Sequence, residues 1–519
     1  MSSPTMQQVR EIDIGVLVAY LIAVVGLGTW LSRKSRNTEQ YTVAGRSLPF
    51  WAIGLSIFGS YISSLSFLGN PGKAFHSNWN PFVFSLATPV AAIVAALVFV
   101  PFYRRSKHVS AYAHLEARFG GWARSYAVVC YLLVQMARTG SIIYLLALAT
   151  EPLLAGGFAS YGWSQKEIIT LIIVATGVLM TVYTMLGGME AVIWVGMVNS
   201  IILLLGPLVC VVALLLAMPE GPGQILRIAA EHDKFSLGSF GPSLSESTFW
   251  VIFVYGIFIN LGNFSVDQGY VQRYLTAKSD RAAGQSVLLG GLLYVPVAAV
   301  FFFIGTGLFA LYTARPDLLP ASIDAANKPD SVFPYFIVNQ LPAGLSGLVI
   351  AAIFAAAMDP SLNSMATLTL CDIYQRHVRP RAGERESMWV LWLSTLGWGV
   401  ICTVVALAMI EVRNILDVWW ELAGIFSGGL FGLFLLGFMV RRAGSVAALM
   451  GVTCGVVVVL WVTFSNFKQG AYWPEMLADL KSPLNGFLST VIGTLTVLIV
   501  GGAVSLFAPT RDHPHTERS

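Results

Sequence analysis

The sequence predicts an all-helical protein that crosses a lipid bilayer many times, and three observations support this fold class. Hydrophobic residues make up 56% of the 519 residues and charged residues only 11%, whereas soluble globular domains carry about 25% charged residues. A membrane-spanning helix needs about 20 mostly apolar residues, and segments of this kind recur along the whole chain. Basic residues gather in alternate connections between these segments. The chain is therefore predicted to be a multi-pass protein of the cell inner (plasma) membrane.

Thirteen apolar segments have the length of a membrane span. In chain order they cover 12–32, 51–70, 81–103, 124–150, 167–186, 189–218, 247–272, 284–312, 344–370, 388–410, 415–440, 443–465 and 485–508. None of the connections between them reads as a soluble domain. Residues 1–508 are therefore expected to form one transmembrane domain and residues 509–519 a short cytoplasmic tail.

The loop charges predict the orientation, because short cytoplasmic loops of membrane proteins collect Lys and Arg. Basic clusters follow the first, third, seventh, ninth and eleventh segments: Arg33, Lys34 and Arg36; Arg104, Arg105 and Lys107; Arg273, Lys278 and Arg281; Arg376, Arg379 and Arg381; Arg441 and Arg442. The connections 151–165 and 313–342 follow even-numbered segments and hold few basic residues. This pattern predicts thirteen crossings, an external N-terminus and a cytoplasmic C-terminus.

Several classes of function are disfavoured by the composition and by missing motifs. The net charge of +4 is small and spread over loops, which argues against nucleic acid as a partner. The five cysteines are isolated, which disfavours a disulfide framework or a metal site. The sequence contains no GxxxxGK[ST] phosphate loop, no GxSxG elbow and no HExxH or CxxC motif. We therefore expect no enzyme activity and no organic cofactor, and no protein partner is evident.

The second apolar segment contains an unusual stretch, WAIGLSIFGSYISSLSFLGNPGKAF, at 51–75. Four glycines weaken its helix and five serines load it with hydroxyls: Gly54, Gly59, Gly69 and Gly72, and Ser56, Ser60, Ser63, Ser64 and Ser66. In hydrocarbon an unpaired backbone group costs several kcal/mol, so an unwound span persists only where it lines a cavity or is buried in protein. Gly-interrupted spans point to the binding site of a transporter near the bilayer midplane. The alternative is a Ser- and Gly-rich face for helix packing.

Arg138 lies in the middle of the fourth apolar segment, within YLLVQMARTGSIIYLL. A charge at this depth is costly, so it indicates a functional site with a partner. The guanidinium can hold a carboxylate through two parallel hydrogen bonds, which would make Arg138 an anchor for an anionic substrate. The alternative pairs Arg138 with a structural carboxylate such as Asp267.

Polar residues also interrupt the seventh segment, at FINLGNFSVDQGYVQRYL. Asn260, Asn263, Asp267 and Gln268 are candidates to line the transport path or to gate its cytoplasmic end. A structural pair between Asp267 and Arg273 is equally compatible with the sequence.

The ninth segment contains IAAIFAAAMDPSLNSMATL. Pro360 removes a helical hydrogen bond, Asp359 is a charge in an apolar run, and hydroxyl and amide groups follow at Ser361, Asn363 and Ser364. Hard oxygen ligands of this kind suit an alkali cation; a proton carried by Asp359 is a second interpretation. A proline kink with a structural aspartate is the alternative.

Taken together, these stretches resemble the sodium:solute symporter family, which includes bacterial carriers of sialic acid, proline and pantothenate. The matching motifs are YISSLSF at 61–67 with GKAF after it, VSAYAHLEARFG at 109–120, MLGGMEAVIW at 185–194, DQGYVQRYL at 267–275, FAAAM, SLNS and DIY within 354–374, and GIFSGGLFGLFLLG at 424–437. They cover nearly the whole chain in the family's order. Arg138 and its surroundings look most similar to the bacterial sialic-acid-type branch.

The resemblance implies a LeuT-type fold: an extra first span, two inverted repeats of five helices and extra C-terminal spans, with the second and seventh spans broken. It implies backbone carbonyls of Gly59 and Ile62 as ligands of Na+, and the polar run of the ninth segment adds Ala356, Asp359 and Ser361 to this expected ion site. It implies a substrate site near Tyr61, Ser63, Ser66, Ser85 and Arg138, to which the residue pattern adds Ser60, Asn260 and Asn263. Gating or structural roles are expected, from the residue pattern alone, for Asp267, Gln268 and Pro360.

The function implied by the resemblance is a symporter that imports a small organic solute down a sodium gradient by alternating access. An anionic or carboxylated solute such as a sialic acid fits Arg138. Tyr61 and Ser85 differ from the side chains expected in sialic acid carriers, so the sequence leaves another solute open.

Two departures from the family pattern concern the ion. The hydroxyl pair expected after AAAM is replaced by Asp359 and Pro360, and about three residues are missing before SLNS. The Thr-Asp pair expected after GGMEAVIW, where the Asp supports a second sodium, is Val195 and Gly196 here. The sequence therefore favours sodium but keeps three alternatives open: coupling to protons, no coupling, or a transporter-like solute sensor.

Overall fold

The computed structural model describes residues 11–32, 37–106, 108–159, 161–320, 323, 325–326, 328–357, 361–411, 415–466 and 479–507. Within these ranges the architecture is helical, and extended pairing is limited to one bridge between Leu48 and Ala277. Apolar side chains dominate each long helix and suit contact with lipid. The helical backbone satisfies its own hydrogen bonds, as a bilayer requires.

The α-helices of the described ranges follow in chain order. They are α1 (Glu11–Ser32), α2 (Thr38–Val43), α3 (Phe50–Tyr61), α4 (Ser64–His76), α5 (Val83–Leu86), α6 (Thr88–Val94), α7 (Val100–Ser106), α8 (Ala113–Phe119), α9 (Gly121–Ala159), α10 (Gln165–Ala217), α11 (Gly223–Glu231), α12 (Phe249–Val266), α13 (Gln268–Leu275), α14 (Asp280–Ala314), α15 (Val332–Gln340), α16 (Leu345–Ala357), α17 (Ser361–Leu368), α18 (Glu384–Ala408), α19 (Ile415–Met439), α20 (Ser445–Asn466) and α21 (Leu488–Phe507). Two stretches are π-helical: Ala95–Phe99 lies in the third predicted segment, and Thr369–Val378 begins at the end of the ninth and extends beyond it.

Each of the thirteen predicted segments coincides with helical structure. Ten helices of the described chain are long and apolar enough to cross a membrane, or eleven if the bent pair in the second segment counts as one. The 53-residue α10 covers two predicted segments. They meet at a kink at Gly188, whose φ of 58° and ψ of −159° are not helical. A β-carbon at Gly188 would also lie 2.9 Å from the ring of Tyr41. The number of crossings itself stays a prediction.

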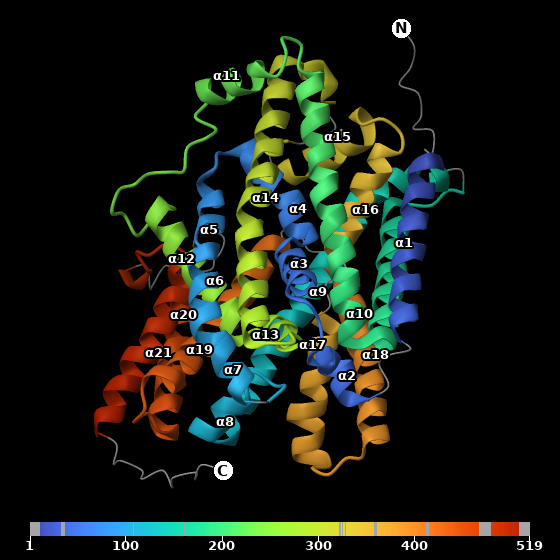
Figure 1. Ribbon diagram of the computed structural model, residues 1–519. Coiled ribbons are helices and arrows are strands. Elements are labelled where there is room, and N and C mark those ends of the chain that lie inside the picture. Colours follow the sequence, from blue (N-terminus) through green and yellow to red (C-terminus); the bar gives the residue numbers. More distant parts are fainter. Residues whose placement is uncertain are drawn as a thin grey trace.

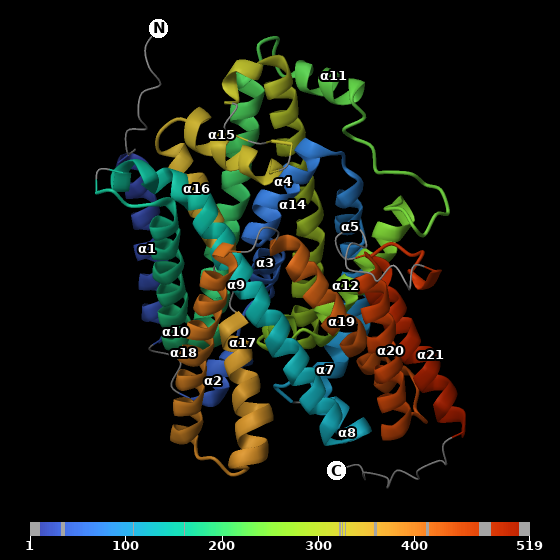
Figure 2. The same ribbon diagram turned by 180° about the vertical axis from the view of Figure 1, so that it is seen from behind.

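The helices form one bundle with the broken second segment inside it (Figures 1 and 2). Helices α19, α20 and α21 pack together on one side, and α1, α10, α16 and α18 lie on the other. Between the two groups, α14 packs along α3 and α4. Helices α11 and α15 lie at one end of the bundle, and α8 lies at the opposite end. Helix α1 begins and α21 ends at opposite ends of the molecule, as an odd number of crossings requires.

Close backbone contact fixes α14 against both halves of the broken segment. A β-carbon at Gly290 would lie 2.5 Å from the Ile57 side chain of α3, and one at Gly305 would lie 2.2 Å from the Pro71 carbonyl oxygen of α4. Only glycine allows this approach. Helices α3 and α4 are therefore held by one continuous neighbour despite the break between them.

The connection between α11 and α12 is fastened to the end of α4 by a buried lysine. Lys234 is 4% exposed, and its Nζ donates to the carbonyl oxygens of Phe75 (2.7 Å) and Ser77 (2.8 Å). The ammonium also lies 3.7 Å from the centre of the Phe309 ring. Burial lowers the pKa of Lys234 from 10.5 to about 8. This contact places a positive charge where the dipole of α4 is negative.

Candidate binding site at the broken second segment

The second predicted span is broken, as expected. Residues Phe50–Tyr61 and Ser66–His76 form two helices whose axes differ by 51°. Between α3 and α4 the backbone is extended, with φ −97° and ψ 92° at Ile62 and φ −90° and ψ 170° at Ser63. The extended residues end the hydrogen-bond ladder of α3, so its last carbonyl groups need other partners.

Two polar side chains supply those partners. Arg138, from the middle of α9, donates from Nη2 to the Ser60 carbonyl oxygen at 3.0 Å. Ser66 Oγ donates to the Tyr61 carbonyl oxygen at 3.3 Å. The structure therefore brings Arg138, Ser60 and Ser66 together at the break. The Ser60 hydroxyl donates to the Ser56 carbonyl oxygen (3.0 Å), so Ser60 faces Arg138 with its backbone and not with its hydroxyl.

Gly59 lies where α3 touches α10. A β-carbon at Gly59 would lie 2.6 Å from Ser200 Oγ and 3.4 Å from the Gly196 carbonyl oxygen. Ser200 Oγ in turn lies 2.6 Å from the Leu55 carbonyl oxygen and 2.7 Å from that of Gly196. The last turn of α3 is thus packed against α10, with its carbonyl ends directed toward the break.

Gly196 occupies the position at which the family pattern has a carboxylate. A β-carbon at Gly196 would lie 2.7 Å from Ser56 Oγ. Ser56 is 2% exposed, and its hydroxyl meets no hydrogen-bond partner within the described residues. No larger side chain fits at Gly196 unless Ser56 moves, which supports the expected loss of a second sodium site.

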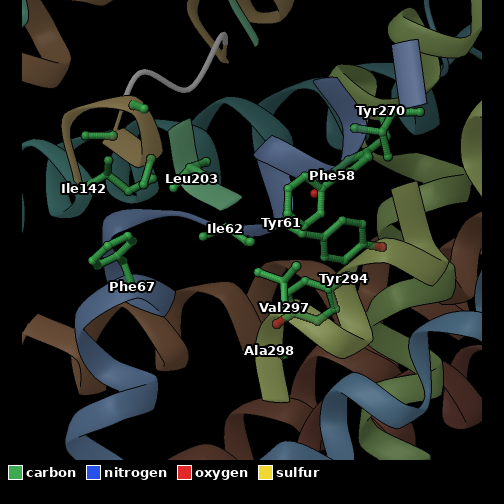
Figure 3. Close-up of a cluster of buried hydrophobic side chains, with 14 of the residues drawn as sticks. Phe58, Tyr61, Ile62, Phe67, Ile142, Leu203, Tyr270, Tyr294, Val297 and Ala298 are labelled. Carbon is green, nitrogen blue, oxygen red and sulfur yellow. The ribbon is translucent and has the colours of Figure 1, made fainter. Parts of the chain in front are cut away.

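The predicted substrate residue Tyr61 belongs to an aromatic cluster on the side of the break that faces α12 and α14 (Figure 3). The Tyr61 ring lies 5.0 Å from that of Tyr294, 5.3 Å from that of Tyr270 and 5.6 Å from that of Phe264, centre to centre. Ser85 approaches the Tyr294 hydroxyl, and Asn263 approaches that of Tyr61. Tyr61 is 8% exposed, and its hydroxyl meets the hydrogen-bond criteria with no partner among the described residues, so contact with substrate stays a prediction.

Two other predicted substrate residues are buried: Ser63 at the break and Asn260 in α12. Ser63 is 7% exposed and opens α4 as its N-cap. Asn260 is completely buried, and its Nδ2 donates to the Gly256 carbonyl oxygen at 2.7 Å. The Asn260 Oδ1 has no hydrogen-bond partner in the part of the chain that the structure describes. It is therefore a candidate acceptor for a ligand hydroxyl.

The ninth predicted segment is divided between α16 and α17. Ala356, near the end of α16, and Ser361, which begins α17, are both buried. Asp359 and Pro360 lie outside the described residues. Ser361 Oγ donates to Gln135 Oε1 at 3.1 Å, and Gln135 Nε2 donates to Asp267 Oδ2 at 2.8 Å.

The seventh predicted segment is also interrupted, at Asp267 between α12 and α13 (φ −75°, ψ 116°). Asp267 Oδ1 accepts from the backbone N–H groups of Gly269 (2.7 Å) and Tyr270 (3.3 Å), which caps α13. Gln268 Nε2 donates to the Val109 carbonyl oxygen at 3.0 Å, and Gln268 Oε1 accepts from the Ala111 N–H at 2.8 Å. Both predicted gating residues therefore make structural contacts, and a role in gating stays a prediction.

Tyrosine hydroxyls satisfy the carbonyl groups that this second break exposes. Tyr103 donates to the Ser265 carbonyl oxygen and Tyr112 to the Val266 carbonyl oxygen (2.8 Å). Both tyrosines are at most 1% exposed. The break at Asp267 is therefore closed on its carbonyl side.

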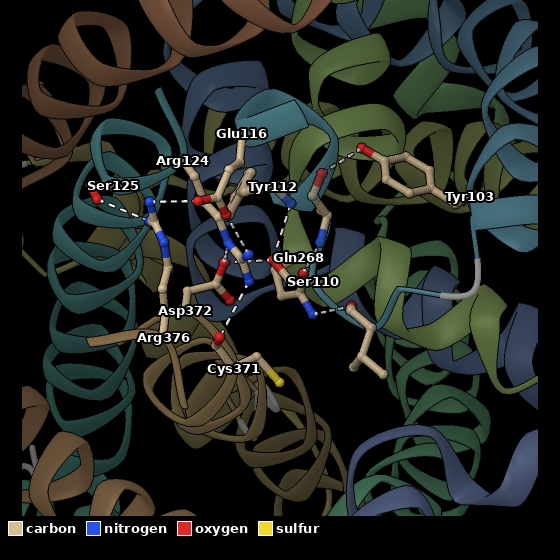
Figure 4. Close-up of polar contacts among 12 residues, drawn as sticks. Tyr103, Ser110, Tyr112, Glu116, Arg124, Ser125, Gln268, Cys371, Asp372 and Arg376 are labelled. Carbon is tan, nitrogen blue, oxygen red and sulfur yellow. Dashed lines mark hydrogen bonds and ion pairs between the residues drawn. The ribbon is translucent and has the colours of Figure 1, made fainter. Parts of the chain in front are cut away.

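Sequence reasoning missed a network of ion pairs around the buried Asp372, beside this break (Figure 4). Arg124 forms ion pairs with Asp372 and with Glu116 (2.8 Å), and Arg376 pairs with the second oxygen of Glu116 (2.8 Å). Ser110 Oγ donates to Asp372 Oδ1 at 2.8 Å. The network joins α8, the start of α9 and the π-helical stretch Thr369–Val378. Its signal in the sequence was Asp372 in the DIY motif, a charge directly after the ninth apolar segment.

Comparison with known proteins settles the family. The family model "Sodium:solute symporter family" matches residues 41–455, most of the chain. The chain belongs to the sodium:solute symporter family. The Sodium/sialic acid symporter SiaT of Proteus mirabilis is 31% identical over 510 residues, which cover 96% of both chains. The Sodium/sialic acid symporter NanT of Aliivibrio fischeri is 32% identical over 494 residues, which cover 93% of this chain and 91% of that one.

A solved structure confirms the fold. The substrate-bound, outward-open state of a Na+-coupled sialic acid symporter superposes with a TM-score of 0.85 and 30% sequence identity, covering 97% of this chain and 99% of that chain. The predicted LeuT-type fold and the resemblance to the sodium:solute symporters are thus confirmed. The protein is a multi-pass membrane transporter of this family and not an enzyme.

Proposed function

We propose that this symporter imports a carboxylated solute of the sialic acid class together with Na+. Two curated relatives that match it over more than nine-tenths of its length are sodium/sialic acid symporters. The chain is 31% and 32% identical to them, and the side chains at the break between α3 and α4 support the same substrate class.

The observation that carries the proposal is the position of Arg138 at the break between α3 and α4. Its guanidinium is half-buried within the bundle and reaches the exposed end of α3 through the Ser60 carbonyl oxygen. The fork of five N–H donors on a guanidinium can hold a backbone carbonyl and a carboxylate at the same time. Ser63 and Ser66 lie within the same turn and offer hydroxyls to the polar groups of an acidic sugar.

The same break supplies the proposed ion site. The carbonyl end of α3 carries a partial negative charge, and carbonyls at the broken ends of transporter helices coordinate Na+ in such folds. The proposed ligands are the carbonyl oxygens of Gly59, Ile62 and Ala356 with the hydroxyl of Ser361. Asp359 is the remaining proposed ligand. Because Gly196 faces Ser56 in place of a carboxylate, we propose a single sodium ion per cycle.

Such a site would couple the two solutes mechanically. In this proposal a cation held between the end of α3 and the start of α17 draws these two elements together, and the solute binds Arg138 at the same break. Ion binding therefore stabilises the conformation that binds solute, and solute binding favours the ion in return. Rocking of one helix group against the other would then expose the loaded site to the opposite side.

The proposal is tested by thermal unfolding of the detergent-purified protein in sodium or potassium at equal ionic strength. Each salt is combined with sialic acids, neutral sugars, amino acids and simple carboxylates. A ligand that binds only the folded state raises the unfolding midpoint. We expect a sialic acid to raise it more in sodium than in potassium. Equal shifts in both salts would overturn sodium coupling, and a response limited to uncharged ligands would overturn the carboxylate.

The proton-coupled and uncoupled alternatives are separated by uptake into proteoliposomes. A rate of sodium-driven uptake that an imposed pH gradient does not change supports the proposal. Uptake that a proton gradient drives without sodium, and that Asp359→Asn abolishes, would favour the proton. Tight binding without any uptake would indicate a sensor.

A further inference from the structure

A short chain of hydrogen bonds joins three helical elements just beside the proposed ion site. Gln135 of α9 accepts from Ser361 Oγ of α17 at 3.1 Å and donates to Asp267 Oδ2, at the junction of α12 and α13, at 2.8 Å. Gln135 is 2% exposed and Ser361 is 4% exposed, so these bonds lie in a dry interior. A primary amide has one donor end and one acceptor end, so its two bonds cannot be exchanged freely.

The carboxylate of Asp267 fixes the direction of this chain. Its Oδ1 accepts from the N–H groups of Gly269 and Tyr270, and its Oδ2 accepts from Gln135. A carboxylate oxygen requires the NH2 end of the Gln135 amide, so the oxygen end must face Ser361. Ser361 then has to donate its only hydroxyl proton to Gln135.

The orientation of the Ser361 hydroxyl matters for a cation. A hydroxyl that has given its proton to an acceptor turns its two lone pairs away from that acceptor. A hydroxyl that accepts instead points its proton into the remaining space and repels a cation. The negative charge of Asp267 also polarises the amide, which makes the Ser361 oxygen more negative than an isolated hydroxyl.

We propose that Gln135 and Asp267 are positioning residues that orient Ser361 as a cation ligand. Neither side chain needs to touch the ion: Asp267 fixes the amide, and the amide fixes the hydroxyl. The inference rests on the proposed sodium site at Ser361. It explains how a site that lacks the hydroxyl pair of the family pattern can retain a well-oriented oxygen.

The sharpest variant is Asp267→Asn, which keeps the shape and reverses the polarity. Asparagine caps a helix as well as aspartate does, so α13 keeps its N-cap. The new NH2 group can face Gln135, whose amide then turns and donates to Ser361 Oγ. We expect the sodium concentration for half-maximal thermal stabilisation to rise about tenfold or more, as for loss of a hydrogen bond to a charged group.

Gln135→Leu removes both bonds and should raise the same sodium concentration by a similar factor. In a Ser361→Ala background it should have no further effect, because the hydroxyl that it orients is gone. The matched control is Gln272→Leu. Gln272 is completely buried and bonds to Asn363 (2.9 Å) and Thr367 (3.0 Å) of the same helix α17, without a bond to Ser361. This control should lower the unfolding midpoint without sodium and leave the sodium dependence unchanged.

The outcomes separate this inference from the proposed function. If the wild-type protein shows no stabilisation specific to sodium, the proposed function fails and the inference falls with it. Suppose instead that sodium stabilises the wild type, Asp267→Asn and Gln135→Leu with the same half-maximal concentration. In that case sodium coupling stands, and the proposed positioning of Ser361 by Gln135 and Asp267 is wrong. An equal loss of affinity in Gln272→Leu would also overturn it, because general loosening of α17 would then explain the effect.

Discussion

The two interrupted helices of this transporter differ in how their exposed backbone groups are satisfied. At the break between α12 and α13, the buried hydroxyls of Tyr103 and Tyr112 hold two carbonyl oxygens, and Asp267 caps the N–H groups. At the break between α3 and α4, the Ser60 carbonyl oxygen meets the cationic side chain of Arg138.

This difference separates a closed break from one that can receive a ligand. A tyrosine hydroxyl has a single proton, so once it is donated to a carbonyl that end of the helix is complete. A guanidinium has several donors and a charge that a carbonyl does not neutralise, so it suits an anion. We therefore expect substitutions at the first break to affect transport and substitutions at the second to affect stability.

The largest effect is expected for Arg138→Ala at the open break. Removal of a charge-assisted contact to a carboxylate should lower uptake of a carboxylated solute on the order of a hundredfold or more. Arg138→Lys keeps the charge and loses the fork, so it should be intermediate. The measurement is uptake into proteoliposomes at matched protein content. Unchanged uptake of the carboxylated solute by Arg138→Ala would assign the arginine to the structure alone.

Gly59→Val should come next, with an effect on the ion. A β-carbon at Gly59 meets Ser200 Oγ at 2.6 Å, so valine must displace the last turn of α3 and its carbonyl oxygens. We expect the sodium concentration for half-maximal uptake to rise about tenfold or more. Gly59→Ala should have a smaller effect, and Ser200→Ala should relieve it, because the nearest remaining atom of residue 200 is 3.8 Å away. Normal sodium dependence in Gly59→Val would exclude the carbonyl site.

Tyr112→Phe tests the closed break with a smaller change. The Val266 carbonyl oxygen would lose its hydroxyl donor in a buried site, which costs about 1–3 kcal/mol of stability. Chemical denaturation should show this loss, while the sodium and solute concentrations for half-maximal uptake stay as in the wild type. A large change in either concentration, with stability intact, would show that the second break also takes part in binding.

The smallest effect concerns α4, the second half of the open break, where Asp330 packs against Gly72. Burial raises the pKa of the Asp330 carboxyl from 3.8 to about 6, although Lys73 opposes this shift. The folded state therefore binds the proton more tightly, so this contribution to stability is present below about pH 4 and is lost as the pH rises through about 6. The unfolding midpoint of the wild type should fall over this range. In Asp330→Asn that fall should be reduced, and an identical profile would remove the carboxyl as its cause.

The sequence predicted the open break better than the closed one, for a physical reason. Glycines and serines in an apolar span indicate a helix that cannot continue, and a lone arginine such as Arg138 indicates a partner at the same depth. The donors at the closed break are Tyr103 and Tyr112, which lie more than 150 residues before their acceptors and look like ordinary apolar residues. No pattern in the sequence around these tyrosines predicts hydrogen bonds to residues so distant in the chain.

The same limit applies to the roles of individual residues. Asp267 was expected to gate the path or to pair with arginine; its carboxylate caps α13 and accepts from Gln135, and the expected roles stay predictions. Tyr61 was expected to touch substrate; its ring packs among three other aromatic rings, and contact with substrate also stays a prediction. Spacing along a helix indicates a face, but it does not indicate which of two neighbouring helices that face will meet.

The buried Lys234, which fastens the connection between α11 and α12 to the end of α4, offers a chemical reporter of conformational opening. Amine-selective reagents attack the neutral form of lysine, and Lys234, with its pKa lowered to about 8, supplies that form near neutral pH more readily than an ordinary lysine. At 4% exposure, however, its Nζ is sealed between two carbonyl oxygens and the Phe309 ring. Lys234 can therefore be modified only when the connection between α11 and α12 lifts from α4. The rate of Lys234 labelling, followed by mass spectrometry, would measure how often the connection between α11 and α12 separates from α4 in the native protein. No engineered probe is needed.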